Sequence, residues 1–302
     1  MAVKKSFGKA FNLFKEAFKE LHKHDPLLLS SSVAFFTLFS LPPILIIVIN
    51  ILGAAFKEKR ISGEVFKTLN EVFGKHSTAL IQGIIENVQK LGGNLLITVL
   101  GTVFLIFVGT TTFSIVHKAL NQIWQVKQKP KSNFIRVLKE RIISLAMILF
   151  SGILFLASLL LDATVAFLKD YIEALIPDLS SIPLFAINQL FSLIIVTIWF
   201  AIIFKFLPNI KIPWKVVWIG ASATGILFSI GKYVLGILLI NGNISTIYGA
   251  AGSMILLLLF LFYSSLILFY GASFTKVFAI TGNYLIEPRN YAVFYEINEV
   301  KK

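Results

Sequence analysis

The stretch Met254-Ile-Leu-Leu-Leu-Leu-Phe-Leu-Phe-Tyr263 decides the fold class of this chain. It lies within a longer segment, Tyr233 to Thr275, that contains no Asp, Glu, Lys or Arg. A helix of about 20 apolar residues crosses the roughly 30 Å hydrocarbon core of a bilayer and satisfies its own backbone hydrogen bonds there. The sequence therefore predicts an integral membrane protein.

The composition of the whole chain supports this class. Of 302 residues, 57% are hydrophobic and 14% are charged, whereas soluble domains carry about 25% charged residues. The chain has no Cys, which excludes disulfides, thiolate metal sites and Cys nucleophiles. Two of its four His residues, His22 and His24, are two positions apart and do not share a helix face. We therefore expect neither a metal centre nor a cofactor.

Apolar runs long enough to cross a membrane recur along the chain, so we expect an all-α, polytopic protein with six transmembrane helices. The predicted spans cover about 27–56, 94–116, 142–168, 182–204, 216–240 and 245–278. Together they form a transmembrane domain over 27–282. The long connection 57–93 has a helical period of its own, and we expect it to form a helical extracytoplasmic loop. The polar tail, 283–302, is expected to fray.

Residues 1–26 predict an amphipathic helix, and Asp25-Pro26 supplies the N-cap and first-turn proline that open the first span. Its apolar positions recur at steps of three and four with lysines between them: Phe7, Phe11, Phe14, Phe18 and Leu21. We expect this helix to lie on the inner leaflet with its Phe side in the membrane. The alternative is a helix packed on the cytoplasmic end of the bundle.

The distribution of basic residues predicts the orientation. Of the 28 Lys and Arg residues, 20 fall on the side that holds both termini, 7 on the other side and one, Lys232, within a span. Cytoplasmic loops of membrane proteins are enriched in Lys and Arg, so both termini are expected in the cytoplasm. The same distribution explains the net charge of +13 without a nucleic-acid partner.

The first predicted span contains features of either a packed helix or a cavity wall. Pro42 and Pro43 remove two backbone hydrogen-bond donors, so we expect a kink there. Hydroxyl residues lie near them: Ser30, Ser31, Ser32, Thr37 and Ser40. A kinked, hydroxyl-rich helix either accommodates its neighbours or forms one wall of a polar cavity.

Two ionisable residues, Asp162 and Lys232, lie within predicted spans at similar distances from the outer ends. Charges inside a membrane are costly, and they are candidate functional groups for that reason. We expect the two to pair across the bundle, and the alternative is that each side chain extends to the nearby interface. The uncharged candidates for an intramembrane polar site are Asn50, Asn188 and Gln189, for which interhelical hydrogen bonds are the alternative.

A polar cluster follows the second predicted span. His117, Lys118 and Trp124 lie at its cytoplasmic end. They form either a solvated helix end or a contact with anionic lipid headgroups.

Four sequence pieces, in order along nearly the whole chain, carry a resemblance to a family. They are Ser32-Val-Ala-Phe-Phe-Thr-Leu-Phe-Ser-Leu-Pro-Pro43, His117-Lys-Ala-Leu-Asn-Gln-Ile-Trp124, Phe206-Leu-Pro-Asn-Ile-Lys-Ile-Pro-Trp214, and Tyr248-Gly-Ala-Ala-Gly-Ser-Met254 leading to Tyr270-Gly-Ala-Ser-Phe274. In these the chain resembles the YihY/virulence factor BrkB family of bacterial inner-membrane proteins. It departs from the family at Ser273, where a Glu is usual, so we expect no role that depends on that carboxylate.

The resemblance implies a six-helix inner-membrane protein with no settled activity. Some members of the family once carried a ribonuclease label, which the residues of this chain do not support. Phosphodiester hydrolysis usually needs clustered carboxylates or His residues, and here the 15 acidic residues are scattered and the four His do not converge. We therefore expect no enzyme.

Two functions remain open. The first is a transporter, exporter or lipid translocator, in which polar groups of the spans line a path for a small molecule or a lipid. The second is a non-transporting envelope or scaffold protein that binds membrane lipids or partner proteins through the amphipathic N-terminus and the basic loops. Association into a homo-oligomer is compatible with both.

Overall fold

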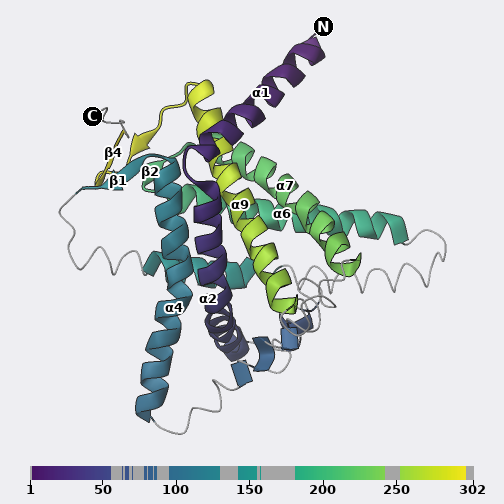
Figure 1. Cartoon of the computed structure of the whole chain (residues 1–302), viewed down its shortest axis with the longest axis vertical. Helices are drawn as coiled ribbons and strands as arrows, with labels where there is room; N and C mark the ends of the chain where they lie inside the picture. Colours follow the sequence, from purple (N-terminus) through teal and green to yellow (C-terminus); the bar gives the residue numbers. More distant parts are fainter. Residues whose placement is uncertain are drawn as a thin grey trace.

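The computed structural model describes residues 2–55, 63, 65–67, 70, 78–79, 81–83, 85–86, 95–129, 142–154, 157, 181–241 and 252–296. This part of the chain is mostly helical (Figure 1). Its long helices are α1 (Ala2–His22), α2 (Pro26–Ala55), α4 (Leu95–Ile123), α6 (Ser181–Phe206), α7 (Trp214–Asn241) and α9 (Gly252–Thr281). A shorter apolar helix covers Ile142–Leu154. Each predicted span in the described part therefore coincides with a helix.

Three of these helices are long and apolar enough to cross a membrane, over Gln189–Phe206, Trp214–Leu235 and Met254–Thr281. A fourth candidate is the broken pair formed by Phe11–His22 and Pro26–Pro42, which is bent by 74°. The described part thus contains three or four candidate spans, and a total of six stays a prediction.

The outward faces of these helices expose large apolar side chains. Examples are Phe35 and Phe39 on α2, Ile226 and Ile230 on α7, and Leu258 on α9. Contiguous exposed apolar surface is rare on soluble monomers and is what a helix facing acyl chains requires. The bundle is therefore built to be surrounded by lipid.

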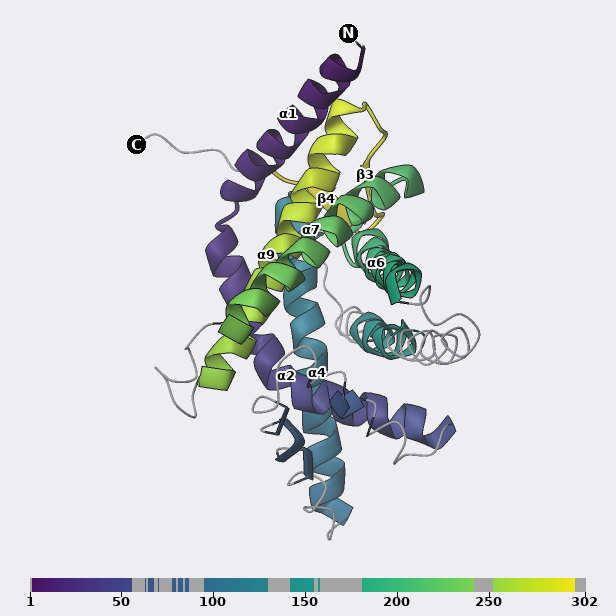
Figure 2. The same cartoon turned by 90° about the vertical axis from the view of Figure 1, so that its right-hand side faces the viewer.

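Helix α9 is the central element of the bundle. It packs against α1, α2 and α7 and also reaches α4, while α2 packs on α4 and α6 packs on α7 (Figures 1 and 2). The apolar stretch that predicts the fold class, Met254 to Tyr263, lies in the first half of this helix. One side of this stretch packs on neighbouring helices, while Met254, Ile255, Leu258 and Leu259 are exposed. A sequence that is apolar almost all round therefore suits both its packed side and a side that faces lipid.

Helices α7 and α9 approach closely through two reciprocal Gly-Thr pairs. A Cβ added to Gly220 would lie 1.9 Å from Oγ1 of Thr275, and one added to Gly271 would lie 1.9 Å from Oγ1 of Thr224. Each Thr hydroxyl donates a hydrogen bond to the carbonyl of the Gly four residues earlier on its own helix. The absence of a side chain at each Gly therefore makes room for the Thr of the other helix.

Helix α2 changes direction along its length. Figure 2 shows its first part running beside α9 and its second part turning across the bundle. Pro42 is buried within this helix. A proline inside a helix removes a donor and favours a bend, so the assignment of this turn to Pro42 and Pro43 remains our prediction.

Two short antiparallel strand pairs cap one end of the bundle. Strand β1 (Val126–Gln128) pairs with β4 (Ala292–Phe294), and β2 (Ile210–Lys211) pairs with β3 (Glu287–Pro288). The expectation of an all-α fold thus missed these strands, and the expected fraying of the tail is wrong for the residues up to Glu296. Strands of two or three residues are too short to show a period of two, and their partners are distant in sequence.

Candidate functional site

The centre of the bundle contains a cavity of about 560 Å³. It is bounded by α2, α4, α6, α7, α9 and the helix Ile142–Leu154. Most of its wall is apolar, and its apolar residues include Leu45, Phe113, Ile148, Phe200 and Phe260. Among the residues that the structure describes, the lining includes no Asp, Glu, Lys, Arg or His. We call this space the central cavity.

Most of the hydroxyl groups on the wall of the central cavity already donate a hydrogen bond within the protein. Thr112 donates to Oγ of Ser40 at 2.8 Å. Ser264 and Ser265 each donate at 2.7 Å to the carbonyl four residues earlier in α9. Ser151 donates at 2.8 Å to a carbonyl of its own helix. These groups therefore offer a ligand weak acceptors rather than a charged or donor-rich path.

Trp199 supplies the other polar contact at the wall of the central cavity. Its indole N–H donates to Oγ of Ser151 at 2.9 Å, which links α6 to the helix Ile142–Leu154. A satisfied indole presents mainly its apolar ring to the cavity. The wall is thus suited to an acyl chain or another weakly polar ligand.

A buried ion pair lies between the strand cap and the central cavity. Lys276 is 7% exposed, and its ammonium donates to Oε1 of Glu20 at 2.5 Å and to the carbonyl of Ile123 at 2.8 Å. Oε1 of Gln125 lies 3.3 Å away as a third acceptor. One lysine on α9 therefore joins α1 to the end of α4.

The surroundings of this ion pair shift two pKa values. Burial raises the pKa of the Glu20 carboxyl, but hydrogen bonds from Lys23 and Lys276 lower it more, to about 2. Burial and the charge of Lys276 lower the pKa of His24, which is 2% exposed. Glu20 is therefore ionised and His24 neutral near pH 7.

The sequence does not predict this pair, because Lys276 entered only the count of basic residues on the side of the termini and Glu20 was not singled out. A signal was present in α1. Ala17, Leu21 and His24 are buried, and Glu20 lies on the face that they define. A carboxylate on the packed face of a helix requires a partner.

The Phe stripe of α1 has a different role from its packed face. Phe11 and Phe18 are 67% and 63% exposed, while Phe14 stacks on Tyr270 and Phe274 of α9. Tyr270 also donates a hydrogen bond to the carbonyl of Phe14 at 3.0 Å. Helix α1 therefore packs on the bundle with one face and presents an apolar edge outward. Its position on the inner leaflet stays a prediction.

The intramembrane candidates lie only partly within the described residues. Lys232 is exposed on α7, and Asp162 lies outside the described residues, so their pairing stays a prediction. Gln189 is half-buried on α6. Asn50 and Asn188 occupy helical positions in α2 and α6, but their side chains, like that of Pro43, lie outside the described part.

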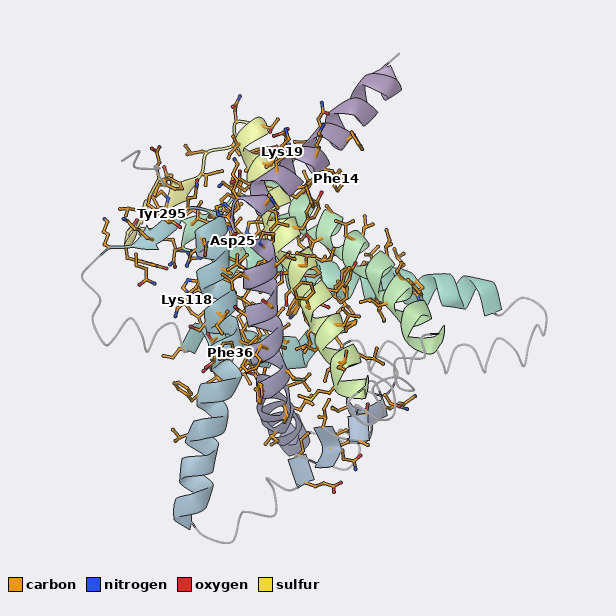
Figure 3. All side chains as sticks on the ribbon, viewed as in Figure 1. Phe14, Lys19, Asp25, Phe36, Lys118 and Tyr295 are labelled. Carbon is orange, nitrogen blue, oxygen red and sulfur yellow. The ribbon has the colours of Figure 1, made fainter. Side chains whose placement is uncertain are left out.

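The predicted headgroup cluster separates into different environments. Lys118 is exposed, and Figure 3 shows it on the side of α4 away from α2. His117 is half-buried, and Trp124 is 4% exposed within the core. Only Lys118 of the three therefore presents an exposed side chain to a headgroup, and contact with lipid stays a prediction.

Asn121 lies between Lys118 and Trp124 in the sequence and connects α4 to the turn between α6 and α7. Its Oδ1 accepts a hydrogen bond from the backbone N–H of Asn209 at 2.7 Å. Tyr291 and Arg289 of the tail also bond to Asn209, through its side chain and its carbonyl. The second and third pieces of the resemblance thus meet in one hydrogen-bonded unit with the tail.

Comparison with known proteins bears on this architecture. Residues 17–291 match the virulence factor BrkB family, and the match extends from α1 to the strand cap. The chain belongs to this family. Ser273, the position at which the chain departs from the family pattern, is 0% exposed, and no hydrogen-bond partner for its hydroxyl lies among the described residues.

Individual relatives are distant members of the same group. The UPF0761 membrane protein of Teredinibacter turnerae is 23% identical over 277 residues, which cover 90% of this chain and 61% of the relative. That of Alkalilimnicola ehrlichii is 25% identical over 252 residues, covering 83% and 54%. That of Ralstonia nicotianae is 25% identical over 255 residues, covering 83% and 55%. This BrkB-family chain therefore spans between 54% and 61% of the length of these relatives.

No solved structure matches the chain significantly. The names of the relatives describe membrane proteins and state no activity. The comparisons thus identify a BrkB-family membrane protein, and its function must be argued from the geometry of the bundle.

Proposed function

We propose that this protein crosses the bacterial inner membrane six times, with both termini in the cytoplasm, and moves a lipid or a similar amphiphile through the central cavity. The observation that carries the proposal is the wall of that cavity. Over the described part of the chain this wall is mostly apolar, has no charged side chain, and has most of its hydroxyl groups donating hydrogen bonds within the protein. The proposal includes no enzymatic step.

The volume and chemistry of the central cavity favour an acyl chain over a solute. Small-molecule sites commonly have volumes of about 300–1,000 Å³, and this one has about 560 Å³. An apolar chain gains about 0.8 kcal/mol for each CH₂ group removed from water. A bare ion or charged solute would lose its hydration without a compensating charge on the wall.

A scaffold that only binds lipid is the second candidate, and one observation favours it. Helix α1 combines exposed Phe11 and Phe18 with exposed Lys15 and Lys19, which is the pattern of a helix that binds a membrane surface. Such a protein would anchor lipids or partner proteins without moving anything across the membrane.

The two candidates differ in lipid movement between leaflets. Purified protein is reconstituted into liposomes with a fluorescent phospholipid, and dithionite reduction measures how fast the inner-leaflet probe becomes accessible. We expect wild-type protein to accelerate this step. Ser264→Trp, which fills the central cavity, is expected to abolish the acceleration.

Leu259→Trp is the matched control, because Leu259 lies on the same helix and faces outward. It is expected to behave like the wild type. Equal rates for protein-free and wild-type liposomes, or full activity of Ser264→Trp, would reject the translocator in favour of the scaffold.

A further inference from the structure

A second apolar space lies beneath the carboxyl-terminal end of α1. This groove has a volume of about 900 Å³ and lies between the α1–α2 junction and helices α7 and α9. Its apolar walls are formed by Leu27, Leu28, Leu227, Leu266 and Ile267. No residue of this wall also lines the central cavity. We call it the elbow groove.

The polar groups of the elbow groove gather where α1 meets α2. His22 and Asp25 line it there, and Tyr270 lines it from α9. Asp25 has a left-handed backbone conformation with φ of 49° and lies at the 74° bend between the two helices. Figure 3 shows Asp25 at this junction. The groove thus has an apolar body and one end that carries a carboxylate and an imidazole.

The position of this end fits a membrane interface. The axes of Phe11–His22 and Pro26–Pro42 differ by 74°, so α1 lies close to the membrane plane if α2 runs near the normal. The exposed Phe11 and Phe18 of α1 then enter the acyl region, and Asp25 comes at headgroup depth. The apolar walls of the groove continue from there into the leaflet.

We propose that the elbow groove binds one phospholipid with a primary ammonium headgroup, such as phosphatidylethanolamine, with an acyl chain along Leu227 and Leu266 and its ammonium on the Asp25 carboxylate. Asp25 is the acidic residue of the lining, and it favours a cation. A primary ammonium donates charge-assisted hydrogen bonds to a carboxylate, which a quaternary ammonium does not. His22 lines the same end of the groove as Asp25 and would contact the phosphate of the bound lipid.

Neighbouring lysines do not reverse this selectivity. Lys19 and Lys23 pair with the glutamates three residues earlier, Glu16 and Glu20, at 2.9 and 2.8 Å. An anionic headgroup at the elbow would therefore face Asp25 beside lysines whose charges are already partly neutralised. Binding at the elbow groove requires no movement of lipid across the membrane, so it is independent of the proposed function.

The test is photo-crosslinking of the full chain, purified in detergent, with phosphatidylethanolamine that carries a diazirine in one acyl chain. Peptide mapping is expected to place adducts on Leu227 and on Leu266, Ile267 and Tyr270. Unlabelled phosphatidylethanolamine is expected to compete at least about tenfold better than phosphatidylcholine or phosphatidylglycerol of the same chains, as one charged hydrogen bond predicts.

Two variants separate the groove from its headgroup site. Leu227→Trp fills the groove and is expected to remove the adducts, while Ile226→Trp, at an exposed neighbouring position, retains them. Asp25→Asn keeps a residue that tolerates φ above zero, and it is expected to retain adducts but lose the tenfold preference. Leu266→Phe serves as a smaller filling change if Leu227→Trp does not fold.

Adducts that survive in both filled variants would overturn the proposal, as would equal competition by the three headgroups. Wild-type protein that forms no adducts and purifies as a dimer, which Leu227→Trp dissociates, would show that a second copy occupies the groove instead.

Discussion

The ammonium of Lys276 lies 2.5 Å from a carboxylate oxygen of Glu20, and the two residues are 256 positions apart in the chain. Through this contact the amino-terminal helix is fixed to the last turns of α9 (Figure 2). The carbonyl of Ile123 accepts a second hydrogen bond from the same ammonium, so α4 is held as well. The ion pair thus joins the ends of three helices at the strand cap.

Removal of either charge is expected to destabilise the protein because the other is left buried. Lys276→Met or Glu20→Gln should each cost about 3 kcal/mol in the free energy of unfolding, and the double variant should cost less than the sum of the two. Denaturant unfolding in detergent measures these values. Lys19→Met is the matched control, because its pair with Glu16 is exposed and should contribute less than about 1 kcal/mol. Strictly additive losses would show that Lys276 and Glu20 act independently.

The stability of the folded protein is expected to decrease in two steps as the pH falls. The pKa of His24 is lower in the folded state than its usual 6.5, so the folded state loses stability as pH falls below that value. The pKa of Glu20 is lowered from 4.5 to about 2, so its contribution is complete above pH 4.5 and is lost as pH falls toward 2. Melting temperatures across this range measure both steps.

His24→Gln should remove the first of these steps and Glu20→Gln the second. His22→Gln, at an exposed position of α1, is the control and should change neither. A melting temperature that rises as pH falls from 6.5 would contradict the assignment, because it would require His24 to bind a proton more readily when folded.

Gly231 is expected to tolerate no side chain. A Cβ at this position would lie 1.5 Å from the hydroxyl oxygen of Tyr263, which donates to the carbonyl of Leu227. Gly231→Ala must displace that ring and break its hydrogen bond, at a cost of about 1–3 kcal/mol. Thermal unfolding should show the loss, and Tyr263→Ala in the same chain should make Gly231→Ala nearly neutral. Gly83→Ala, with nothing within 4 Å of the added carbon, is the control.

Asn121 is expected to protect the backbone amide of Asn209 from hydrogen exchange. Asn121→Ala leaves the N–H of Asn209 without its acceptor and should cost about 1–3 kcal/mol. Asn121→Asp keeps an acceptor oxygen and should cost less. Hydrogen exchange provides a local measurement, because the Asn209 amide should exchange faster in Asn121→Ala alone. Unchanged exchange at Asn209 would show that this hydrogen bond does not hold the turn.

The sequence predicts the helices of the bundle well because membrane spans depend on long apolar runs. The predicted ends of α2, α6 and α7 lie within two residues of the observed ends. Helix α4 extends to Ile123, beyond the predicted span, because a helix does not need to end where its apolar run does. Helix α9 ends at Thr281, close to the predicted end at 278, and its last turns carry Lys276.

The candidate site was less predictable. Hydroxyls along the spans suggested a polar path, but an apolar wall emerges because Ser264 and Ser265 bond to their own helix. The Glu20 and Lys276 contact depends on tertiary packing between distant segments, which charge counting does not detect. The sequence also does not predict the fit of Thr275 against Gly220, because the two residues lie on different helices and meet only through tertiary packing.

Cysteine accessibility in intact bacterial cells tests the membrane arrangement on which the whole account depends, and the natural chain has no Cys to interfere. Single variants Lys19→Cys, Glu86→Cys and Glu287→Cys place thiols at exposed positions of α1, the 57–93 connection and the strand cap. We predict that a membrane-impermeant maleimide labels only Glu86→Cys before permeabilisation and all three afterwards. Labelling of Lys19→Cys or Glu287→Cys in intact cells would contradict the account.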